Sequence, residues 1–376
     1  MHPRLPQFTK YFLRLGTIGF GGPIALCAQM KVELVDKNKW FTLQEYEEGF
    51  AFSQSAPGPV AIQLAMYLGF IRFGVFGATA GGLAFIATPF VLVLLLSYFY
   101  VSYGTLGVIE SALKGVSPAV IAVILHAAFQ LGRGLLRELK KWLIAAVSLF
   151  LAVFAKIDLS IIIIGAGLIG LGFMILQQRG LCGSMIPLYL LGAHQISPVS
   201  GDPGLSILPK LAWLFFKAGA LTFGSGYVVV AFIQQGVVDE YQWLNVRQFL
   251  DGIAVGQITP GPVVITSTFV GYLVHGLSGA IVSTVAVLLP VYLITIVGAP
   301  LIAKYRSSPL LQGFMSAANA AAIGVITSVA VMMTGSAVVD WKTGAIMVLS
   351  LAALFLRNVP SVIVILVAGV LGAILF

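Results

Sequence analysis

The residues of this sequence with the clearest chemical potential are glycines and prolines in four short segments that interrupt apolar runs. They are residues 20–23 (Phe-Gly-Gly-Pro), residues 223–226 (Phe-Gly-Ser-Gly), and the Pro-Gly-Pro segments at residues 57–59 and 260–262. Proline in the first turn of a helix, preceded by glycine or serine, is typical of a helix start. The free N–H groups and the positive dipole end of such a start favour an anion. The four breaks therefore predict an anion site.

Neutral polar side chains lie beside these breaks in the sequence, and they include the two glutamines Gln54 and Gln257. Several neutral donors can hold a tetrahedral oxyanion and still release it, because no fixed cation clamps it. The alternative is a set of proline kinks in packed helices, with glycine for close packing. Breaks at matching places in the two halves of the chain favour the anion site. The predicted substrate-binding residues are Gly21, Gly22, Pro23, Gln54, Ser55, Gly58, Gly224, Ser225, Gly226, Gln257, Thr259 and Gly261.

Two acidic residues, Glu48 and Asp251, occupy matching places on the segments that lead to the Pro-Gly-Pro breaks. An acid inside a membrane is costly and often functional, for example in proton coupling. The alternative is an interfacial position one or two turns into a helix. Other polar pairs nearby, Thr42 with Glu45 and Asn245 with Gln248, have the spacing of capping boxes and predict helix starts.

Motifs of enzymes and cofactor sites are absent from the sequence or unconvincing. It contains no His-Glu-x-x-His, no Gly-x-Ser-x-Gly and no phosphate-binding loop with its lysine. A Gly-x-Gly-x-x-Gly pattern begins at Gly165, but it lies inside an apolar stretch, which favours helix packing over dinucleotide binding. Cysteine and histidine do not cluster at the spacing of a metal site. We therefore expect neither an enzyme, a cofactor nor a bound metal.

Composition identifies the class of protein that must position these residues. Only 9% of the 376 residues are charged and 59% are hydrophobic, whereas soluble domains carry about 25% charged residues. The chain cannot cover a soluble globule, so it is predicted to be an integral membrane protein. We interpret the net charge of +8 as basic cytoplasmic loops near anionic lipid headgroups rather than as a nucleic-acid surface.

The chain contains an internal repeat. Residues 12–62 align without a gap with residues 215–265, and the identities include a tryptophan, a glutamine and the Pro-Gly-Pro segment. Apolar runs of near-spanning length continue in parallel through both halves. We expect an N-terminal transporter repeat over residues 1–177 and a C-terminal repeat over residues 210–376. A linker over residues 178–209, itself a candidate for membrane insertion, joins them.

The basic residues predict opposite orientations for the two repeats. Residues 133–141 carry four Lys or Arg residues and their counterpart, residues 335–342, carries one; residues 304–306 carry two and residues 102–106 none. The positive-inside rule then places equivalent loops on opposite sides of the membrane, as in inverted-repeat transporters. The predicted fold is an all-α polytopic membrane protein with two inverted-topology repeats, broken or re-entrant helices and about 10–13 membrane segments. Either the linker crosses the membrane or one broken segment is re-entrant.

At these residues the sequence resembles the chromate ion transporter family in its long, fused two-domain form, and the resemblance covers nearly the whole chain. The segments that carry it are Phe20-Gly21-Gly22-Pro23, Trp40, Gln54-x-x-Pro57-Gly58-Pro59, Thr222-Phe223-Gly224, Trp243-Leu244 and Gly256-Gln257-x-Thr259-Pro260-Gly261-Pro262. The sequence departs from the family pattern at Arg247 and Gln248, where acidic residues are common, and at Gly236, where half one keeps Glu33.

The resemblance implies a multi-pass carrier of the inner cell membrane that exports chromate, with sulfate as the look-alike anion. We accordingly expect a secondary transporter in which the two halves rock around a central site to give alternating access. A sulfate, molybdate or phosphate carrier and a passive anion channel remain the alternatives. The expected partners are the oxyanion and the lipid bilayer, together with a second copy of the chain in a homodimer, and no nucleic acid.

Overall fold

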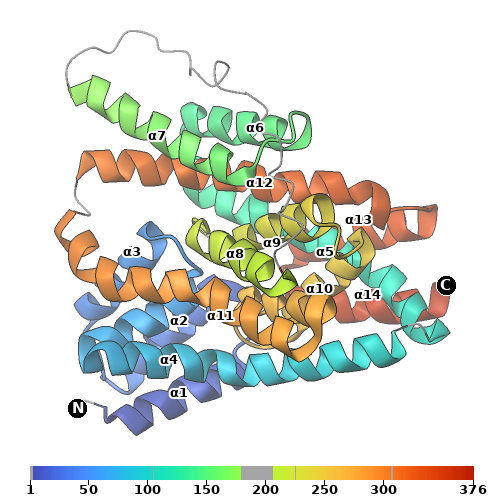
Figure 1. Cartoon of the computed structure of the whole chain (residues 1–376), viewed down its shortest axis with the longest axis horizontal. Coiled ribbons are helices and arrows are strands. Elements are labelled where there is room, and N and C mark those ends of the chain that lie inside the picture. Colours follow the sequence, from blue (N-terminus) through green and yellow to red (C-terminus); the bar gives the residue numbers. More distant parts are fainter. Residues whose placement is uncertain (1–2, 105, 179–205, 225, 306–307) are drawn as a thin grey trace.

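The computed structural model describes residues 3–104, 106–178, 206–224, 226–305 and 308–376. Regular structure in these residues is entirely helical (Figure 1), which confirms the predicted all-α class. The first half contains α1 (Leu5–Ile18), α2 (Gly22–Met30), the π-helical η1 (Lys31–Lys37), α3 (Leu43–Ser55), α4 (Val60–Tyr103), α5 (Gly107–Leu135), α6 (Leu139–Val153) and α7 (Leu159–Gln178). The second half contains α8 (Ile207–Ala220), α9 (Tyr227–Gln234), the π-helical η3 (Gln235–Glu240), α10 (Val246–Ile258), the 3₁₀ turn η4 (Val263–Ile265), α11 (Thr266–Tyr305), α12 (Pro309–Ala337), α13 (Trp341–Arg357) and α14 (Ser361–Leu375).

Several of these helices are built for a lipid environment. Five stretches of the described residues are long and apolar enough to cross a membrane, namely α4, α5, α7, η4 with α11, and α12. Large apolar side chains also stay on the outside of the molecule, such as Phe76 (81% exposed) and Leu356 (78% exposed). Such exposure is tolerated where hydrocarbon rather than water surrounds the helices. The polytopic membrane protein predicted from composition is confirmed.

The predicted helix breaks are present. The chain leaves helical structure between α1 and α2, between α3 and α4, between α8 and α9, and between α10 and η4. Residue 225 of the third break lies outside the described residues. The capping boxes also form as predicted: the Thr42 Oγ1 accepts the backbone N–H of Glu45 at 3.1 Å, and the Asn245 Oδ1 accepts that of Gln248 at 2.9 Å. These caps begin α3 and α10, the helices that lead to the Pro-Gly-Pro breaks.

A reversal that the sequence analysis did not anticipate divides both α4 and α11. At Gly74 the backbone has φ 63° and ψ −149°, and at Gly276 it has φ 59° and ψ −147°. The chain folds back there, since Gly69 approaches Gly77 so closely that a Cβ atom would overlap the carbonyl group, and Gly271 meets Gly279 in the same way. Each Pro-Gly-Pro break is therefore followed by a short helix, residues 60–73 or 266–274, and the chain then turns back into a longer helix.

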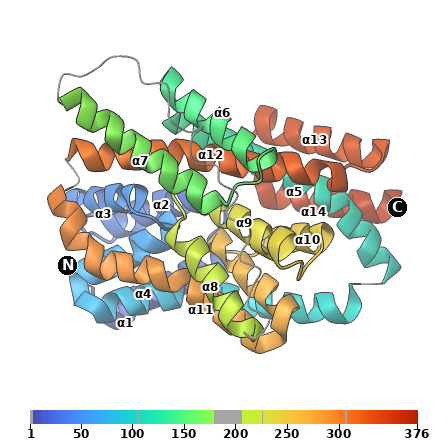
Figure 2. The same cartoon turned by 45° about the horizontal axis from the view of Figure 1, so that its top comes forward.

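The two halves exchange helices. Helices α6 and α7 of the first half pack against α12 of the second, and α13 and α14 of the second pack against α5 of the first. Figure 2 shows α7 lying along α12 on one side and α14 beside α5 on the other. Reciprocal packing of this kind is what a two-fold relation between the halves produces.

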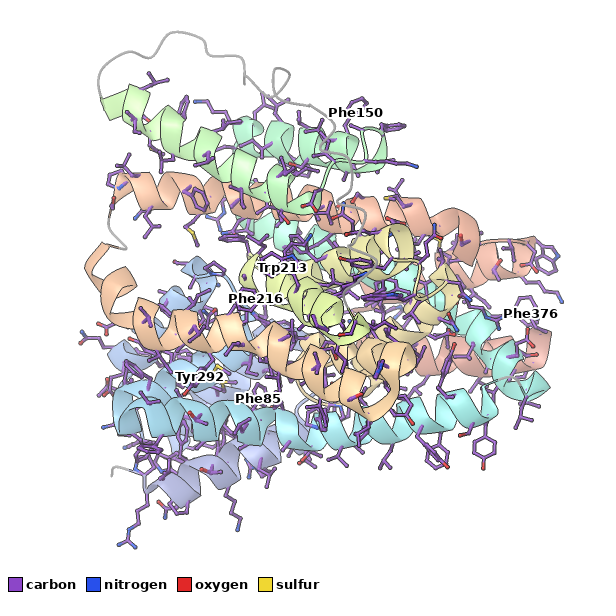
Figure 3. The ribbon with its side chains drawn as sticks, in the orientation of Figure 1. Phe85, Phe150, Trp213, Phe216, Tyr292 and Phe376 are labelled. Carbon is purple, nitrogen blue, oxygen red and sulfur yellow. The ribbon has the colours of Figure 1, made fainter. Side chains whose placement is uncertain are left out.

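Equivalent helices of the two halves also meet in opposite directions. The returning parts of α4 and α11 lie side by side, and Figure 1 shows them running antiparallel. The Thr79 and Tyr292 hydroxyl groups lie 2.7 Å apart across this contact, and Tyr292 is labelled between the two helices in Figure 3. Whether equivalent loops lie on opposite sides of a membrane stays a prediction.

Residues in left-handed backbone conformation recur at matching places. Among the described residues other than glycine, positive φ occurs at Lys39 and Gln242 after the π-helical turns, and at Lys156 and Asn358 after α6 and α13. Such residues are uncommon outside glycine. Their recurrence in pairs shows that the two halves share turn geometry even where their residue types differ. Residues 179–205, most of the expected linker, lie outside the described residues.

Candidate anion site at the helix breaks

The breaks of one half are hydrogen-bonded to the breaks of the other. The backbone N–H of Gly58 donates to the carbonyl oxygen of Thr222 at 2.6 Å. The backbone N–H of Gly261 donates to the carbonyl oxygen of Gly19 at 2.8 Å. Each Pro-Gly-Pro segment is thus joined to the Phe-Gly break of the opposite half by an equivalent bond, which brings the four predicted breaks to the interface between the halves.

Close packing at this interface requires glycine at both Pro-Gly-Pro centres. Gly58 has φ 141° and Gly261 has φ 99°, conformations that other residues rarely adopt. A Cβ atom on Gly58 would lie 3.1 Å from Cγ1 of Val291 in the second half, and one on Gly261 would lie 2.6 Å from Cγ of Pro89 in the first half. The glycines therefore serve the meeting of the two halves, and their own N–H groups are already used.

The helix starts that follow the breaks keep their first-turn N–H groups free of side-chain caps. This holds for α2, which begins after the left-handed Gly21, for α4 after Pro59, and for α9 after Gly226. Uncapped first turns present donors and a positive dipole end. Gly22 and Pro23 lie in the first turn of α2. The donors that remain for an anion are those of these first turns rather than those of Gly58 and Gly261.

The neutral side chains predicted to bind the anion differ between the two halves in burial and in hydrogen bonding. Gln257 is buried, and its amide donates to the Tyr227 hydroxyl at 2.9 Å. The Thr259 hydroxyl donates to the carbonyl oxygen of Val255 at 2.8 Å, so its hydrogen is used within α10. Gln54 is exposed and Ser55 half-buried. The half-two side chains are therefore held by hydrogen bonds, whereas the half-one side chains are more exposed. Ser225 lies outside the described residues.

Two buried carboxamides at the breaks each have an oxygen without a hydrogen-bond partner among the described residues. They are Gln63, whose Nε2 donates to the carbonyl oxygen of Pro57 at 3.2 Å, and Asn319 on α12. The Asn319 Oδ1 would lie 2.9 Å from a Cβ atom on Gly224, so it borders that break. Asn319 was not predicted from the sequence, because it lies far from the breaks along the chain. Its signal is a lone amide in the alanine-rich run 317–322.

The cation nearest each of the first breaks, Arg14 on α1 and Lys217 on α8, forms an ion pair. Arg14 of α1 pairs with Glu33 in its own half. Lys217, the equivalent residue of α8, pairs with Asp158 of the other half at 3.1 Å. The exchange of partner follows from Gly236, which replaces the acid and whose Cβ atom would overlap the side chain of Leu214. Arg14 and Lys217, the cations one turn before these breaks, are therefore both engaged in ion pairs.

The two predicted coupling acids lie in different surroundings. Glu48 is half-buried and accepts a hydrogen bond from the Gln44 amide at 3.0 Å. Asp251 is 1% exposed, and its Oδ2 accepts the Tyr100 hydroxyl at 2.8 Å. Its Oδ1 has no hydrogen-bond partner among the described residues. The hydrogen bonds described for the two acids go to Gln44 and Tyr100, outside the breaks, so both acids stay predictions for coupling rather than for anion binding.

Comparison with known proteins gives consistent matches along the chain. The model of the chromate transporter family matches residues 6–171 and again residues 209–373. A chromate transport protein of Cupriavidus metallidurans is 37% identical, over 93% of this chain and 88% of its own length. A probable chromate transport protein of Synechococcus elongatus is 36% identical, over 100% and 97%. An uncharacterized transporter of Methanocaldococcus jannaschii is 28% identical, over 96% and 92%. No solved structure matches.

Proposed function

Because this chain belongs to the chromate transporter family, in its fused two-domain form, we propose that it is a secondary transporter that exports chromate across the cell membrane. The proposal includes, as an alternative to chromate, a similar tetrahedral oxyanion such as sulfate. Members of the family are transporters, not enzymes. The relatives named as chromate transport proteins support the substrate class, and the apolar, polytopic fold supports an inner-membrane, multi-pass location.

The observation that carries the proposed site is the pair of equivalent hydrogen bonds from Gly58 to Thr222 and from Gly261 to Gly19. A site built between halves that meet at their breaks changes its exposure when one half rocks against the other. The oxyanion would be bound by the uncapped first turns of α2, α4 and α9, with Gln54 and Gln257 at its edges. Ser55, Thr259, Ser225 and the break glycines complete the proposed site.

Uncharged hydrogen-bond donors are suited to an anion that must be bound and then released. Backbone N–H groups at helix starts stabilise negative charge without a counter-ion, and the nearby cations Arg14 and Lys217 are engaged in ion pairs. An anion bound in this way is released when the halves separate, because no charge-assisted clamp holds it. The antiparallel contact of α4 with α11 supports the inverted arrangement that alternating access requires.

Counterflow in proteoliposomes tests the proposal. Vesicles loaded with unlabelled chromate or sulfate and diluted into labelled sulfate should accumulate label transiently, and chloride loading should not support accumulation. A passive anion channel shows no saturable exchange, and a carrier for molybdate or phosphate would prefer those anions as the internal ion. Either result would replace the proposed function by the corresponding alternative. A homodimer is a separate proposal, which the mass of the detergent-solubilised protein decides.

A further inference from the structure

A cavity of about 420 Å³ lies at the start of α10, away from the helix breaks. Its polar lining comes from both halves, with Tyr100 and Glu110 from the first half and Asn245, Arg247, Gln248 and Asp251 from the second. Glu110 and Arg247 are each 42% exposed at their side chains, whereas Asp251 is buried. The cavity therefore leads from a charged, exposed mouth to one buried carboxyl group.

The Asp251 carboxyl group is incompletely bonded. Its Oδ2 accepts the Tyr100 hydroxyl at 2.8 Å, while its Oδ1 has no hydrogen-bond partner among the described residues. A buried polar atom left without a partner is costly, and the cost is greatest for a charged group. A proton on Oδ1 removes that cost. The buried Asp251 carboxyl group is thus suited to gaining and losing a proton.

The charged groups around Asp251 are two cations and one further carboxylate. On α10 itself Arg247 faces the cavity, and its Nη1 lies 3.2 Å from Oε1 of Glu110 on α5. Lys114 of α5 pairs with the same Glu110 at 3.4 Å. From α4 the titratable group is Tyr100, and α11 contributes only Leu273 to the lining, although it carries Tyr272 and His275 beside it. The segments α12, α14 and η4 carry no titratable side chain.

We propose that Asp251 alone binds the coupling proton of this transporter, and that the proton reaches it from water through the cavity whose mouth Glu110 and Arg247 form. The step is a proton transfer: a hydronium ion in the cavity gives its proton to Oδ1, leaving water and a neutral carboxylic acid. This inference rests on the proposed transport function and deepens it. Glu48, the matching residue of half one, is only half-buried and does not line this cavity.

The site is placed to link protonation to movement of the halves. Tyr100 belongs to the first half and Asp251 to the second, so their hydrogen bond ties the halves together. A hydrogen bond to a carboxylate is roughly twice as strong as one to a neutral acceptor, so protonation weakens the tie. Asp251 also lies six residues before Gln257 on α10, which is about 9 Å along the helix axis.

A metal cation fits this site less well than a proton. Hard cations are held by several oxygen ligands. Here one unpartnered carboxylate oxygen is present, the Tyr100 hydroxyl is turned to donate, and Arg247 adds positive charge. Binding of sodium in place of a proton is the alternative that the experiment distinguishes.

The test is infrared difference spectroscopy of the full-length protein in lipid, titrated over pH, with Asp251→Asn and the matched control Glu48→Gln. The protein should show the carbonyl stretch of a buried protonated carboxyl group, lost in Asp251→Asn and kept in Glu48→Gln. Tyr100→Phe should keep the band and move its titration midpoint to higher pH, because the carboxylate loses a donor. This readout needs no transported anion, so its failure is distinct from failure of the proposed function.

Counterflow with an imposed pH gradient completes the test. A gradient should change the rate of oxyanion uptake in the unmodified protein and in Glu48→Gln, but not in Asp251→Asn, which should still exchange anion for anion. A carboxyl band that persists in Asp251→Asn, or a pH response that survives in it, would overturn the inference. So would a band that disappears on replacing choline with sodium at fixed pH, since that outcome identifies a metal-cation site.

Discussion

At the residue scale, the function proposed here depends on backbone geometry more than on side-chain charge. Gly58 and Gly261 combine a positive φ with a tightly packed neighbour from the opposite half, Val291 and Pro89 respectively. Their N–H groups bond across the interface between the halves rather than to an anion. The break residues thus fall into two groups, those that join the halves and those that leave first-turn donors free.

Gly261→Ala should destabilise the protein, because alanine must adopt φ 99° and its Cβ atom must displace Pro89. A strained backbone conformation alone is expected to lower stability by about 1–3 kcal/mol. The matched control is Gly165→Ala on α7, where a Cβ atom meets nothing within 4 Å and helix propensity improves. Thermal unfolding in detergent measures both variants. Equal midpoints for the two would show that the geometry at Gly261 is not restrictive.

The hydrogen-bond partners of the break residues could not be predicted from the sequence. The Pro-Gly-Pro pattern and its repetition were sufficient to predict the breaks and the glutamines beside them. They could not reveal that the Gly58 and Gly261 N–H groups are already bonded, because their partners Thr222 and Gly19 come from the opposite half. Asn319 was missed for the same reason, since its closeness to Gly224 depends on how α12 packs.

At the element scale, helix starts were predictable and reversals were not. The capping boxes at Thr42 and Asn245 form as local rules require. The reversals at Gly74 and Gly276 lie within apolar runs where glycine is equally typical of helix packing. Only the contacts Gly69–Gly77 and Gly271–Gly279 distinguish a hairpin from a continuous helix, and these contacts are tertiary.

An ion pair between elements gives a prediction about pH. Burial by itself would raise the pKa of Asp158, but the hydrogen bond from Ser160 and the charge of Lys217 outweigh it and hold the pKa below its ordinary value. A carboxyl group with a lowered pKa in the folded state stabilises that state above its unfolded pKa, and the contribution is lost as pH falls through the folded pKa.

Lys217→Met should therefore lower stability at pH 7 and have a diminishing effect as pH falls below about 4. The pair is partly exposed, with Asp158 at 36%, so the expected effect at pH 7 is about 0.2–1 kcal/mol. Lys141→Met is the control, because its partner Glu138 is more exposed and a smaller effect is expected. The thermal midpoint is measured for each variant from pH 7 to pH 3. A difference for Lys217→Met that grows on acidification would contradict the assignment.

At the scale of the whole molecule, the two halves are joined by an exchange of helices. Helices α6 and α7 have their packing surface on α12, and α13 and α14 have theirs on α5. A duplication was visible in the sequence, and the paired basic loops indicated inversion. The exchange itself was not predictable, because the apolar faces of these helices do not encode which half covers them.

The proposed inversion of the two halves predicts that equivalent positions lie on opposite sides of the membrane. Leu139 and Trp341 begin α6 and α13 and are 76% and 78% exposed. Leu139→Cys and Trp341→Cys, made in a chain with Cys27 and Cys182 replaced by alanine, should react with a membrane-impermeant maleimide from opposite sides of the membrane. Labelling of both cysteines from the same side of oriented vesicles would show that the halves are not inverted.

The central claim is that an oxyanion is carried at the meeting point of the four breaks. The most direct test is counterflow of labelled chromate in proteoliposomes containing the chain with Gln54→Ala and Gln257→Ala together, beside the unmodified chain. Gln44→Ala is the control, because Gln44 is an exposed glutamine on α3 that bonds to Glu48 rather than to a break. We expect the double variant to lose most of the saturable exchange, and Gln44→Ala to keep it. Unchanged exchange and unchanged chromate binding in a folded double variant would contradict the claim.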